Sequence, residues 1–273
     1  MALLILLNIL LFANSVQGSV KKGVSLWPGI HLCDDFKVLN NMSWWYDWSM
    51  DLSFWHEKVS KVCPPSTDQS MPPHIPMVKR YNNHTVLNIQ GDALFILGFN
   101  EPDHADQADM TPQQAADAWP EIEKHSHGKL LVGPAPAAQH FHWSDEFYRL
   151  CHGCRIDYVA AHAYSCDAHH VMSFLQKLYH RYNKKIWLTE FACPQSSDEN
   201  QQLHLMQTLL PQLEAADYVF RYSWFEARIK RSFGNGWITP AASLLHNDSS
   251  TLTNIGRFYN NFQANGHNPH VVG

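Results

Sequence analysis

Short apolar runs alternate along the chain with longer segments that mix polar and apolar residues. Eight of these runs have the length of a β-strand, and they are apolar almost without interruption rather than at every second position. Such continuity is typical of parallel strands that are buried on both faces. In chain order the candidate strands read GVSLW, SWWYDW, HIPMV, LFILGFN, LLVGPA, IDYVAAHAY, KIWLTEF and YVFRYSWF.

The segments between these strands carry helix signals. Thr111 stands directly before a proline and three residues before Gln114, a pattern that predicts a capping box at a helix start. Ser144 and Ser197 are predicted N-caps of two later helices, and residues 170–182 place apolar side chains on one helical face. Strands that alternate with helices eight times predict an α/β protein with a single (β/α)8 TIM barrel.

The amino terminus predicts secretion. Its apolar run at residues 3–12 is too short to cross a bilayer and is followed by small residues, which is typical of a signal peptide. We therefore expect residues 1–18 to be removed and residues 19–273 to form one extracellular domain. Three N-glycosylation sequons point to the same compartment, at Asn41, Asn83 and Asn247.

Charge and histidine content narrow the possible partners. The formal net charge is −5 and no basic run is present, which argues against a nucleic acid or an anionic membrane as partner. The 18 histidines include no H-E-x-x-H and no zinc-finger spacing, so neither a metal nor another cofactor is predicted. The ten tryptophans fit either a bulky core or stacking against the apolar faces of sugars.

Two of the predicted strands end in a carboxylate. Glu101 ends the fourth strand in GFNEPD, and Glu190 ends the seventh in WLTEFACP. Because the carboxyl ends of barrel strands meet at one mouth, the two side chains should face each other. Such a pair supplies an acid for the leaving oxygen and a base or nucleophile for the anomeric carbon, as glycoside hydrolysis requires. The competing interpretation makes Glu101 a turn carboxylate that caps the next helix.

The ordered motifs GFNEPD, VGPAPA, IDYVAAHAY, WLTEFACP and YVFRYSWF resemble those of glycoside hydrolase family 128, whose members include endo-β-1,3-glucanases. The resemblance runs from residue 21 to residue 259 and implies a retaining catalytic barrel over residues 19–273. It implies that Glu101 is the general acid/base and Glu190 the nucleophile of an enzyme that hydrolyses β-1,3-glucan. We expect this secreted enzyme to be a monomer.

The surroundings of Glu101 lead to two further expectations. Burial and the nearby charge of Glu190 should raise the pKa of Glu101. Pro102 should hold the residue before it in an extended backbone conformation.

Three polar residues are expected to assist the two glutamates. Asn100 can donate its amide to the sugar 2-hydroxyl. The resemblance implies that Tyr164 hydrogen-bonds the nucleophile and that His162 contacts substrate. A histidine on an apolar strand is more often a core residue, so this second interpretation of His162 stays open.

Three tryptophans are candidates for sugar stacking. The resemblance implies an aromatic platform at Trp224, near the end of the eighth strand. Trp48 ends the second strand and Trp143 lies in the segment after the fifth, so both could wall a subsite. Packing in the barrel core is the alternative for all three.

The six cysteines allow fifteen pairings. Two of them follow the sixth and seventh strands, and neighbouring strands lie about 5 Å apart, within reach of a disulfide. The predicted bridges are Cys166–Cys193, Cys33–Cys63 and Cys151–Cys154.

Two other functions stay open. The chain could be a catalytically silent barrel that binds β-glucan or associates with a cell wall. It could also hydrolyse a different β-linked polysaccharide, since the shape of the subsites is not readable from sequence.

Overall fold

The computed structural model describes residues 18–89, 93–232 and 234–264. All of the predicted signal peptide except Gly18 therefore lies outside the described residues. The strands are β1 (Lys22–Ser25), β2 (Trp44–Tyr46), β3 (Phe95–Leu97), β4 (Leu130–Val132), β5 (Val159–Tyr164), β6 (Ile186–Ala192) and β7 (Val219–Trp224). The α-helices are α1 (Asp35–Val38), α2 (Ser53–Lys58), α3 (Pro112–Lys124), α4 (His142–Leu150), α5 (Ala168–Tyr182), α6 (Glu199–Ala215) and α7 (Asn254–Asn261). Short 3-10 helices are η1 (Pro28–Ile30), η2 (Pro65–Ser70), η3 (Gly234–Gly236) and η4 (Pro240–Ala242).

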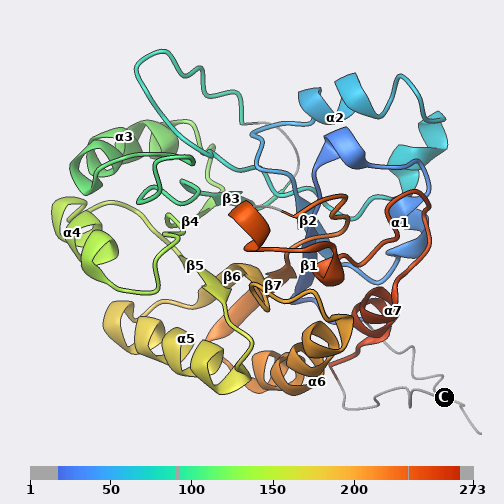
Figure 1. Cartoon of the computed structure of the whole chain (residues 1–273). Helices are drawn as coiled ribbons and strands as arrows, with labels where there is room; N and C mark the ends of the chain where they lie inside the picture. Colours follow the sequence, from blue (N-terminus) through green and yellow to red (C-terminus); the bar gives the residue numbers. More distant parts are fainter. Residues whose placement is uncertain (1–17, 90–92, 233, 265–273) are drawn as a thin grey trace, which may run out of the picture.

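The strands lie around the centre of the molecule (Figure 1). Five of them form one sheet in the order β2-β1-β7-β6-β5, and β3 pairs with β4 in a second sheet. All pairings between these strands are parallel, as their continuous apolar runs predict. The chain is therefore an α/β protein with a TIM-barrel-like fold, as predicted.

Isolated bridges connect the two sheets on both sides. Val132 of β4 pairs with Tyr158, directly before β5. On the other side, His74 pairs with β2 and Met77 pairs with β3, so the predicted third strand HIPMV occupies its place between them. This segment contributes bridges rather than a regular strand, and the prediction of eight regular strands is wrong at this position. Prolines within and before the segment explain the difference, because each removes a backbone donor from the ladder.

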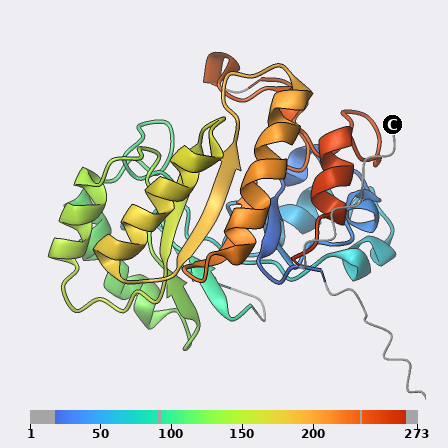
Figure 2. The ribbon, with the colours of Figure 1, turned by 90° about the horizontal axis from the view of Figure 1, so that it is seen from below.

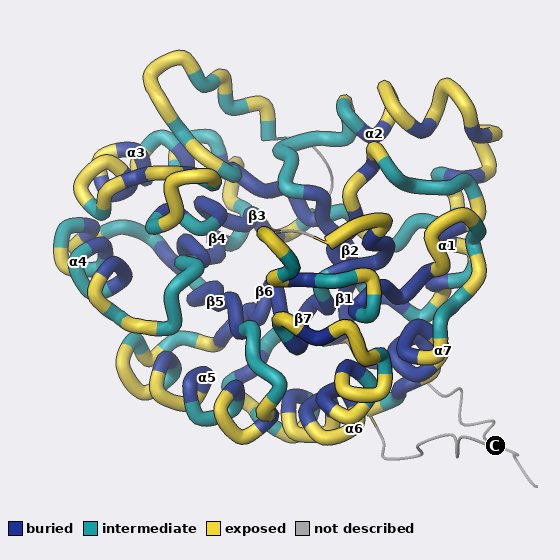
Figure 3. The backbone as a smooth tube through the Cα atoms, viewed as in Figure 1, coloured by how far each residue is buried: buried dark blue, intermediate teal, exposed yellow. Residues whose placement is uncertain are grey.

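Helices form the outer layer. Figure 2 shows α5 and α6 lying along the outside of the strands, and in Figure 3 the strands are buried while the helices present exposed outer surfaces. Leu175 of α5, Leu209 of α6 and Leu188 of β6 are fully buried in the same apolar cluster. Burial of each such leucine contributes roughly 1.5–3 kcal/mol to the stability of the fold.

The helix starts follow local capping chemistry in part. Thr111 and Gln114 form the predicted capping box at the start of α3. The other two predicted caps are wrong. Ser144 lies inside α4, which starts two residues earlier, and Asp198 rather than Ser197 accepts a hydrogen bond at the start of α6. A carboxylate and a hydroxyl both serve as N-caps, so two such neighbours cannot be told apart by composition.

A buried lysine joins the first strand to the last helix. Lys22 of β1 is fully buried, and its ammonium donates to the carbonyl oxygens of Tyr259, Asn260 and Phe262 at 2.8, 3.0 and 2.7 Å. These carbonyls end α7, where the helix leaves acceptors without intrahelical donors and where the helix dipole favours a cation.

We expect Lys22→Met to lower the free energy of unfolding by about 3 kcal/mol, because it leaves buried carbonyl groups without a donor. Urea denaturation measures this loss. Lys21→Met is the matched control, since Lys21 donates in the same way to three carbonyls at the end of α6 but is only partly buried. Water can replace the donor there, so the control should lose less than Lys22→Met. Equal losses would contradict this account of Lys22.

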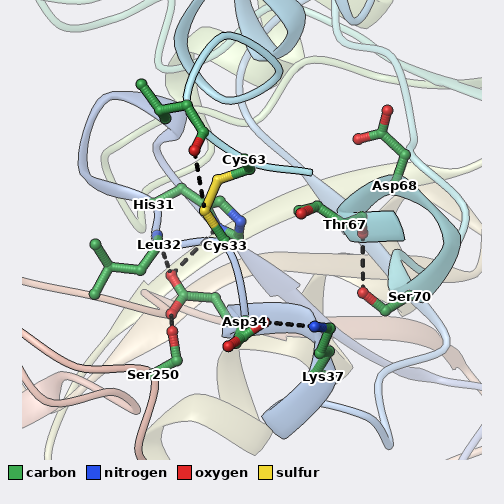
Figure 4. The surroundings of a disulfide bond; sticks show 12 residues. His31, Leu32, Cys33, Asp34, Lys37, Cys63, Thr67, Asp68, Ser70 and Ser250 are labelled. Carbon is green, nitrogen blue, oxygen red and sulfur yellow. Dashed lines mark hydrogen bonds and ion pairs between the residues drawn. A yellow bond between two sulfur atoms is a disulfide. The ribbon is translucent and has the colours of Figure 1, made fainter. Parts of the chain in front are cut away.

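The structure joins the cysteines in the three predicted pairs, Cys33–Cys63, Cys151–Cys154 and Cys166–Cys193. The first bridge lies beside His31, Leu32 and Ser250 (Figure 4). It ties the segment after η1 to the segment after α2. The bridge between Cys166 and Cys193 links the segments that follow β5 and β6, next to the strands that carry the site described below.

Candidate active site

The two predicted glutamates come from different strands of the barrel, with β4 and β5 between them. Glu190 lies inside β6 rather than at its end, and it is 4% exposed. Glu101 lies four residues beyond the end of β3, where its N–H donates to the carbonyl of Ala135 at 2.8 Å. Asp103 fixes the same loop by accepting hydrogen bonds from the N–H groups of Ala137 and Ala138. The segment after β4 thus holds Glu101 in place.

The backbone at Glu101 differs from the predicted extended conformation. Its φ is 45°, in the left-handed region that residues with a Cβ atom rarely adopt. Trp48, which lies across the pocket, has a φ of 61°. Strained backbone of this kind is concentrated at functional sites in proteins, where the surrounding structure holds it. Pro102 favours an extended backbone at Glu101, but the hydrogen bonds on both sides of Glu101 hold it in the left-handed region instead.

His162 lies between the two carboxylates. It occupies the position on β5 that pairs with Glu190 on β6, next to a register shift in the ladder. Its Nδ1 atom lies 2.9 Å from Oε1 of Glu101 and 3.3 Å from Oε2 of Glu190. The nearest ligand atoms of the three side chains lie within 4.8 Å of one another. The two carboxylates therefore face each other at short range, with an imidazole beside both.

Glu190 accepts hydrogen bonds from three aromatic side chains. The Tyr164 hydroxyl donates to Oε2 at 2.6 Å, and the Trp48 indole donates to Oε1 at 3.0 Å. The Tyr46 hydroxyl lies 3.4 Å from the same Oε1 atom. Such donors favour the ionised form of a carboxyl group and fix its orientation. The expectation from the resemblance that Tyr164 contacts Glu190 agrees with this geometry.

The surroundings shift the pKa values of the two carboxyl groups in opposite directions. At Glu101 burial favours the neutral form, but the hydrogen bond and positive charge of His162 outweigh it and lower the pKa. At Glu190 burial raises the pKa, and repulsion from Glu101 adds to the rise despite the opposing effects of His162, Tyr164 and Trp48. The prediction of a raised pKa at Glu101 is therefore wrong, because it left out a cation beside the carboxylate.

The two carboxylates favour the charged form of His162. Burial lowers the pKa of this histidine, but the charges of Glu190 and Glu101 raise it by more, to above its ordinary value. Its side chain is fully buried and does not line the pocket. His162 thus contacts the two glutamates. It does not reach the pocket, where the predicted contact with substrate would have to form.

A pocket of about 1300 Å³ opens in front of the two glutamates. Its walls are rich in aromatic and charged groups. The aromatic side chains are Trp27, Trp48, Tyr164, Phe225 and Trp237. The charged or imidazole side chains are Lys79, Glu101, His104, Asp106, Glu190, Glu226, Lys230 and Arg231.

The predicted binding residues divide into two groups. Asn100, Trp48 and Tyr164 line the pocket. Trp224 and Trp143 do not: both are buried, and their indoles donate to backbone carbonyls of Ala242 and Met110. The interpretation of these two tryptophans as stacking residues is wrong, and packing is their role. Both packing and stacking favour large apolar rings, so residue type alone does not separate them.

Several pocket residues were missed from the sequence. Trp27 and Trp237 are 43% and 42% exposed, which is unusual for residues of this size. Trp27 follows β1 after one intervening residue, Leu26, so its place after a strand was a readable signal. Trp237 belongs to the segment after β7 and has no local signal. Tyr46 was missed as a partner of Glu190 rather than as a pocket residue, and it shares one face of its strand with Trp48, a relation visible from the alternation of WWYDW.

Glu101, His162 and Glu190 are also the group of described residues whose ligand atoms could surround a metal ion. Two carboxylate oxygens and an imidazole nitrogen suit zinc or a similar cation. The same three groups can also share a proton, because Nδ1 of His162 lies 2.9 Å from Oε1 of Glu101 and 3.3 Å from Oε2 of Glu190.

The comparisons with known proteins point to one family. Residues 25–259 match the family model described as the glycosyl hydrolase catalytic core. Alkali-sensitive linkage protein 1 of Schizosaccharomyces pombe is 28% identical over 261 residues, which cover 90% of this chain and 45% of that protein. The chain thus spans less than half the length of this relative.

Solved structures of glycoside hydrolase family 128 cover nearly the whole chain. An endo-β-1,3-glucanase from Sorangium cellulosum is 29% identical with a TM-score of 0.75, covering 88% of this chain and 98% of that one. One from Pseudomonas viridiflava is 30% identical with a TM-score of 0.69, at 90% and 98% coverage. A third, from Amycolatopsis mediterranei in complex with laminarihexaose, is 25% identical with a TM-score of 0.70, at 89% and 99% coverage.

Proposed function

The chain belongs to glycoside hydrolase family 128, within the glycosyl hydrolase catalytic core family, and from this premise we propose that it is a secreted, retaining endo-β-1,3-glucanase. Glu101 acts as general acid/base and Glu190 as nucleophile. The observation that carries the mechanism is the separation of the two carboxylates. One oxygen of each carboxylate lies within 4.8 Å of the other, which is compatible with the roughly 5–5.5 Å between the carboxyl groups of retaining glycosidases and leaves little room for the water of inverting ones, whose groups lie roughly 6.5–9.5 Å apart.

The pocket supports a polymeric, neutral substrate. Its volume of about 1300 Å³ exceeds the roughly 300–1,000 Å³ that is usual for a small-molecule site. Exposed aromatic rings on its walls suit stacking on glucosyl units. An open pocket of this size accommodates several linked sugars, which favours cleavage within the chain over removal of terminal units. Asn100 lies beside Glu101, where its amide can reach a sugar hydroxyl.

The hydrogen bonds support the division of roles. Glu190 accepts from Tyr164 and Trp48, which suits an ionised nucleophile that attacks the anomeric carbon. Glu101 shares a 2.9 Å hydrogen bond with the charged His162. The imidazolium can pass its Nδ1 proton to Glu101, which then protonates the leaving glycosidic oxygen. After departure of that product, Glu101 takes a proton from water, which attacks the glucosyl–Glu190 ester and releases the sugar with its original configuration.

This arrangement predicts how His162 controls the pH profile. The charge of His162 lowers the pKa of both Glu101 and Glu190. In His162→Asn that charge is lost, so both pKa values rise. The acidic limb of kcat/KM reports ionisation of the nucleophile Glu190. We expect this limb to move to higher pH, by roughly 1 unit or more.

The pH dependence of kcat/KM for wild type and His162→Asn on linear β-1,3-glucan measures this shift. An unchanged acidic limb, or one displaced to lower pH, would refute the role of His162 as the cation between the carboxylates.

The stereochemistry of the first product tests the proposed mechanism. Proton NMR of a fresh digest of β-1,3-glucan resolves the two anomers before they equilibrate. We expect the β-anomer to accumulate first. Early appearance of the α-anomer would show inversion and would rule out Glu190 as a covalent nucleophile.

Three disulfides support the secreted part of the proposal, since such bridges persist in oxidising compartments. Among the described helices, none has the length and apolarity needed to cross a membrane. Asn83 and Asn247 are exposed and Asn41 is partly exposed, so all three predicted glycosylation sites are sterically available. We propose that the mature chain begins after residue 18 and acts as a monomer without a metal or other cofactor.

A further inference from the structure

A third glutamate lies in the pocket and takes no part in the mechanism above. Glu226 follows β7 after one intervening residue, Phe225, and both residues line the pocket. We propose that Glu226 is a specificity-determining residue that donates a hydrogen bond from a protonated carboxyl group to a hydroxyl of the glucosyl unit beside Glu190. This inference deepens the proposed function and rests on it.

The burial and bonding of Glu226 point to a ligand. The residue is 2% exposed, yet its Oε1 atom has no hydrogen-bond partner among the described residues. A buried polar atom without a partner is rare in folded proteins and is unfavourable for the fold. Because Glu226 lines the pocket, a hydroxyl of a bound sugar can approach its carboxyl group. The structure therefore has a polar group prepared for substrate rather than for packing.

The neighbours of Glu226 place it on the nucleophile's side of the pocket. The ring of Phe225 lies 5.8 Å from the ring of Tyr164 and 5.9 Å from that of Trp48. Both of those side chains donate to Glu190. A sugar that is attacked by Glu190 therefore lies within the same group of side chains as Glu226.

The electrostatic surroundings favour a neutral acid at this position. Burial raises the pKa of Glu226 well above its ordinary value, and the charge of Glu190 adds to the rise. A neutral carboxyl group has an O–H donor as well as a carbonyl acceptor, so it can both give and receive a hydrogen bond. A carboxylate at the same place would only accept. Neutral Glu226 thus offers a donor beside the nucleophile without adding a second negative charge there.

The test compares two substitutions of similar size. Glu226→Gln keeps a donor and an acceptor, whereas Glu226→Leu keeps the bulk and removes both. Glu146→Gln is the control for loss of a carboxylate, since Glu146 is a partly exposed residue of α4 paired with Arg149. Initial rates on linear β-1,3-linked glucohexaose and thermal unfolding are measured for all three variants and the wild type.

We expect Glu226→Gln to keep kcat/KM within about threefold of wild type and Glu226→Leu to lower it about 10- to 100-fold, because the sugar hydroxyl loses its partner. The melting temperature of Glu226→Leu should equal or exceed that of wild type, because an unpaired buried polar group is removed. A merely structural role predicts the reverse, a lower melting temperature for Glu226→Leu.

Two outcomes overturn the inference. If the wild type cleaves the hexaose and both Glu226 variants cleave it at the same rate, the role of Glu226 is overturned while the proposed function stands. A wild-type protein that neither cleaves nor binds the hexaose overturns the proposed function and this inference with it.

Discussion

Glu190→Ala is expected to lose hydrolysis of β-1,3-glucan by a factor on the order of 10⁵, as other enzymes do when the covalent nucleophile is removed. The cavity left by the side chain sits beside the anomeric carbon, so a small anion can take its place. Added azide should therefore restore some turnover and yield the glucosyl azide of inverted, α configuration. Chromatography and NMR of the product measure both the rescue and the anomer.

Glu146→Ala on α4 is the matched control, because it removes a partly exposed glutamate outside the pocket. It should retain wild-type activity with or without azide. A β-configured azide from Glu190→Ala would mean that the roles of Glu101 and Glu190 are exchanged.

Glu101→Ala is expected to show a loss that depends on the leaving group. General acid catalysis contributes about 10²–10⁴-fold, and glucan needs it because the departing sugar alkoxide is a poor leaving group. We expect a loss of that size on linear β-1,3-glucan. The dinitrophenolate of a dinitrophenyl β-glucoside departs without protonation. The rate at which this substrate forms the glucosyl–enzyme should therefore fall far less.

Steady-state and burst kinetics on the two substrates measure this difference. With Glu101→Ala, azide should attack the glucosyl–enzyme and yield the β-configured azide, opposite to the product from Glu190→Ala. Equal losses on both substrates would contradict the role of Glu101 as the acid.

Much of the framework was predictable because it depends on periodicity and on the ends of strands. The continuous apolar runs around Ile96 and Leu188 indicated parallel buried strands, and barrel geometry then brought Glu101 and Glu190 to one side. The segment HIPMV was wrongly predicted to be a regular strand. Its apolar residues favour a buried strand, but its prolines remove backbone donors from the ladder. The pair Cys166–Cys193 followed from the adjacency of strands, and the other two pairs were assigned to the cysteines that remained.

The electrostatics of the site depend on contacts that sequence spacing does not show. His162 is 61 residues from Glu101 along the chain, yet their hydrogen bond reverses the expected direction of the pKa shift at Glu101. Of the two wrongly assigned tryptophans, Trp224 ends β7 and Trp143 lies in the first turn of α4, and both side chains are buried in the core. Side-chain direction at strand ends is decided by tertiary packing, which a single sequence does not reveal.

The measurement that tests the central claim most directly is reducing-end release from linear β-1,3-glucan by the secreted protein, with Glu190→Gln assayed alongside. We expect wild type to release short oligosaccharides and Glu190→Gln to release none while still binding the glucan. Retention of wild type on insoluble glucan without any release would contradict the claim and favour a silent binding protein. Release from another β-linked polysaccharide alone would contradict the assigned linkage.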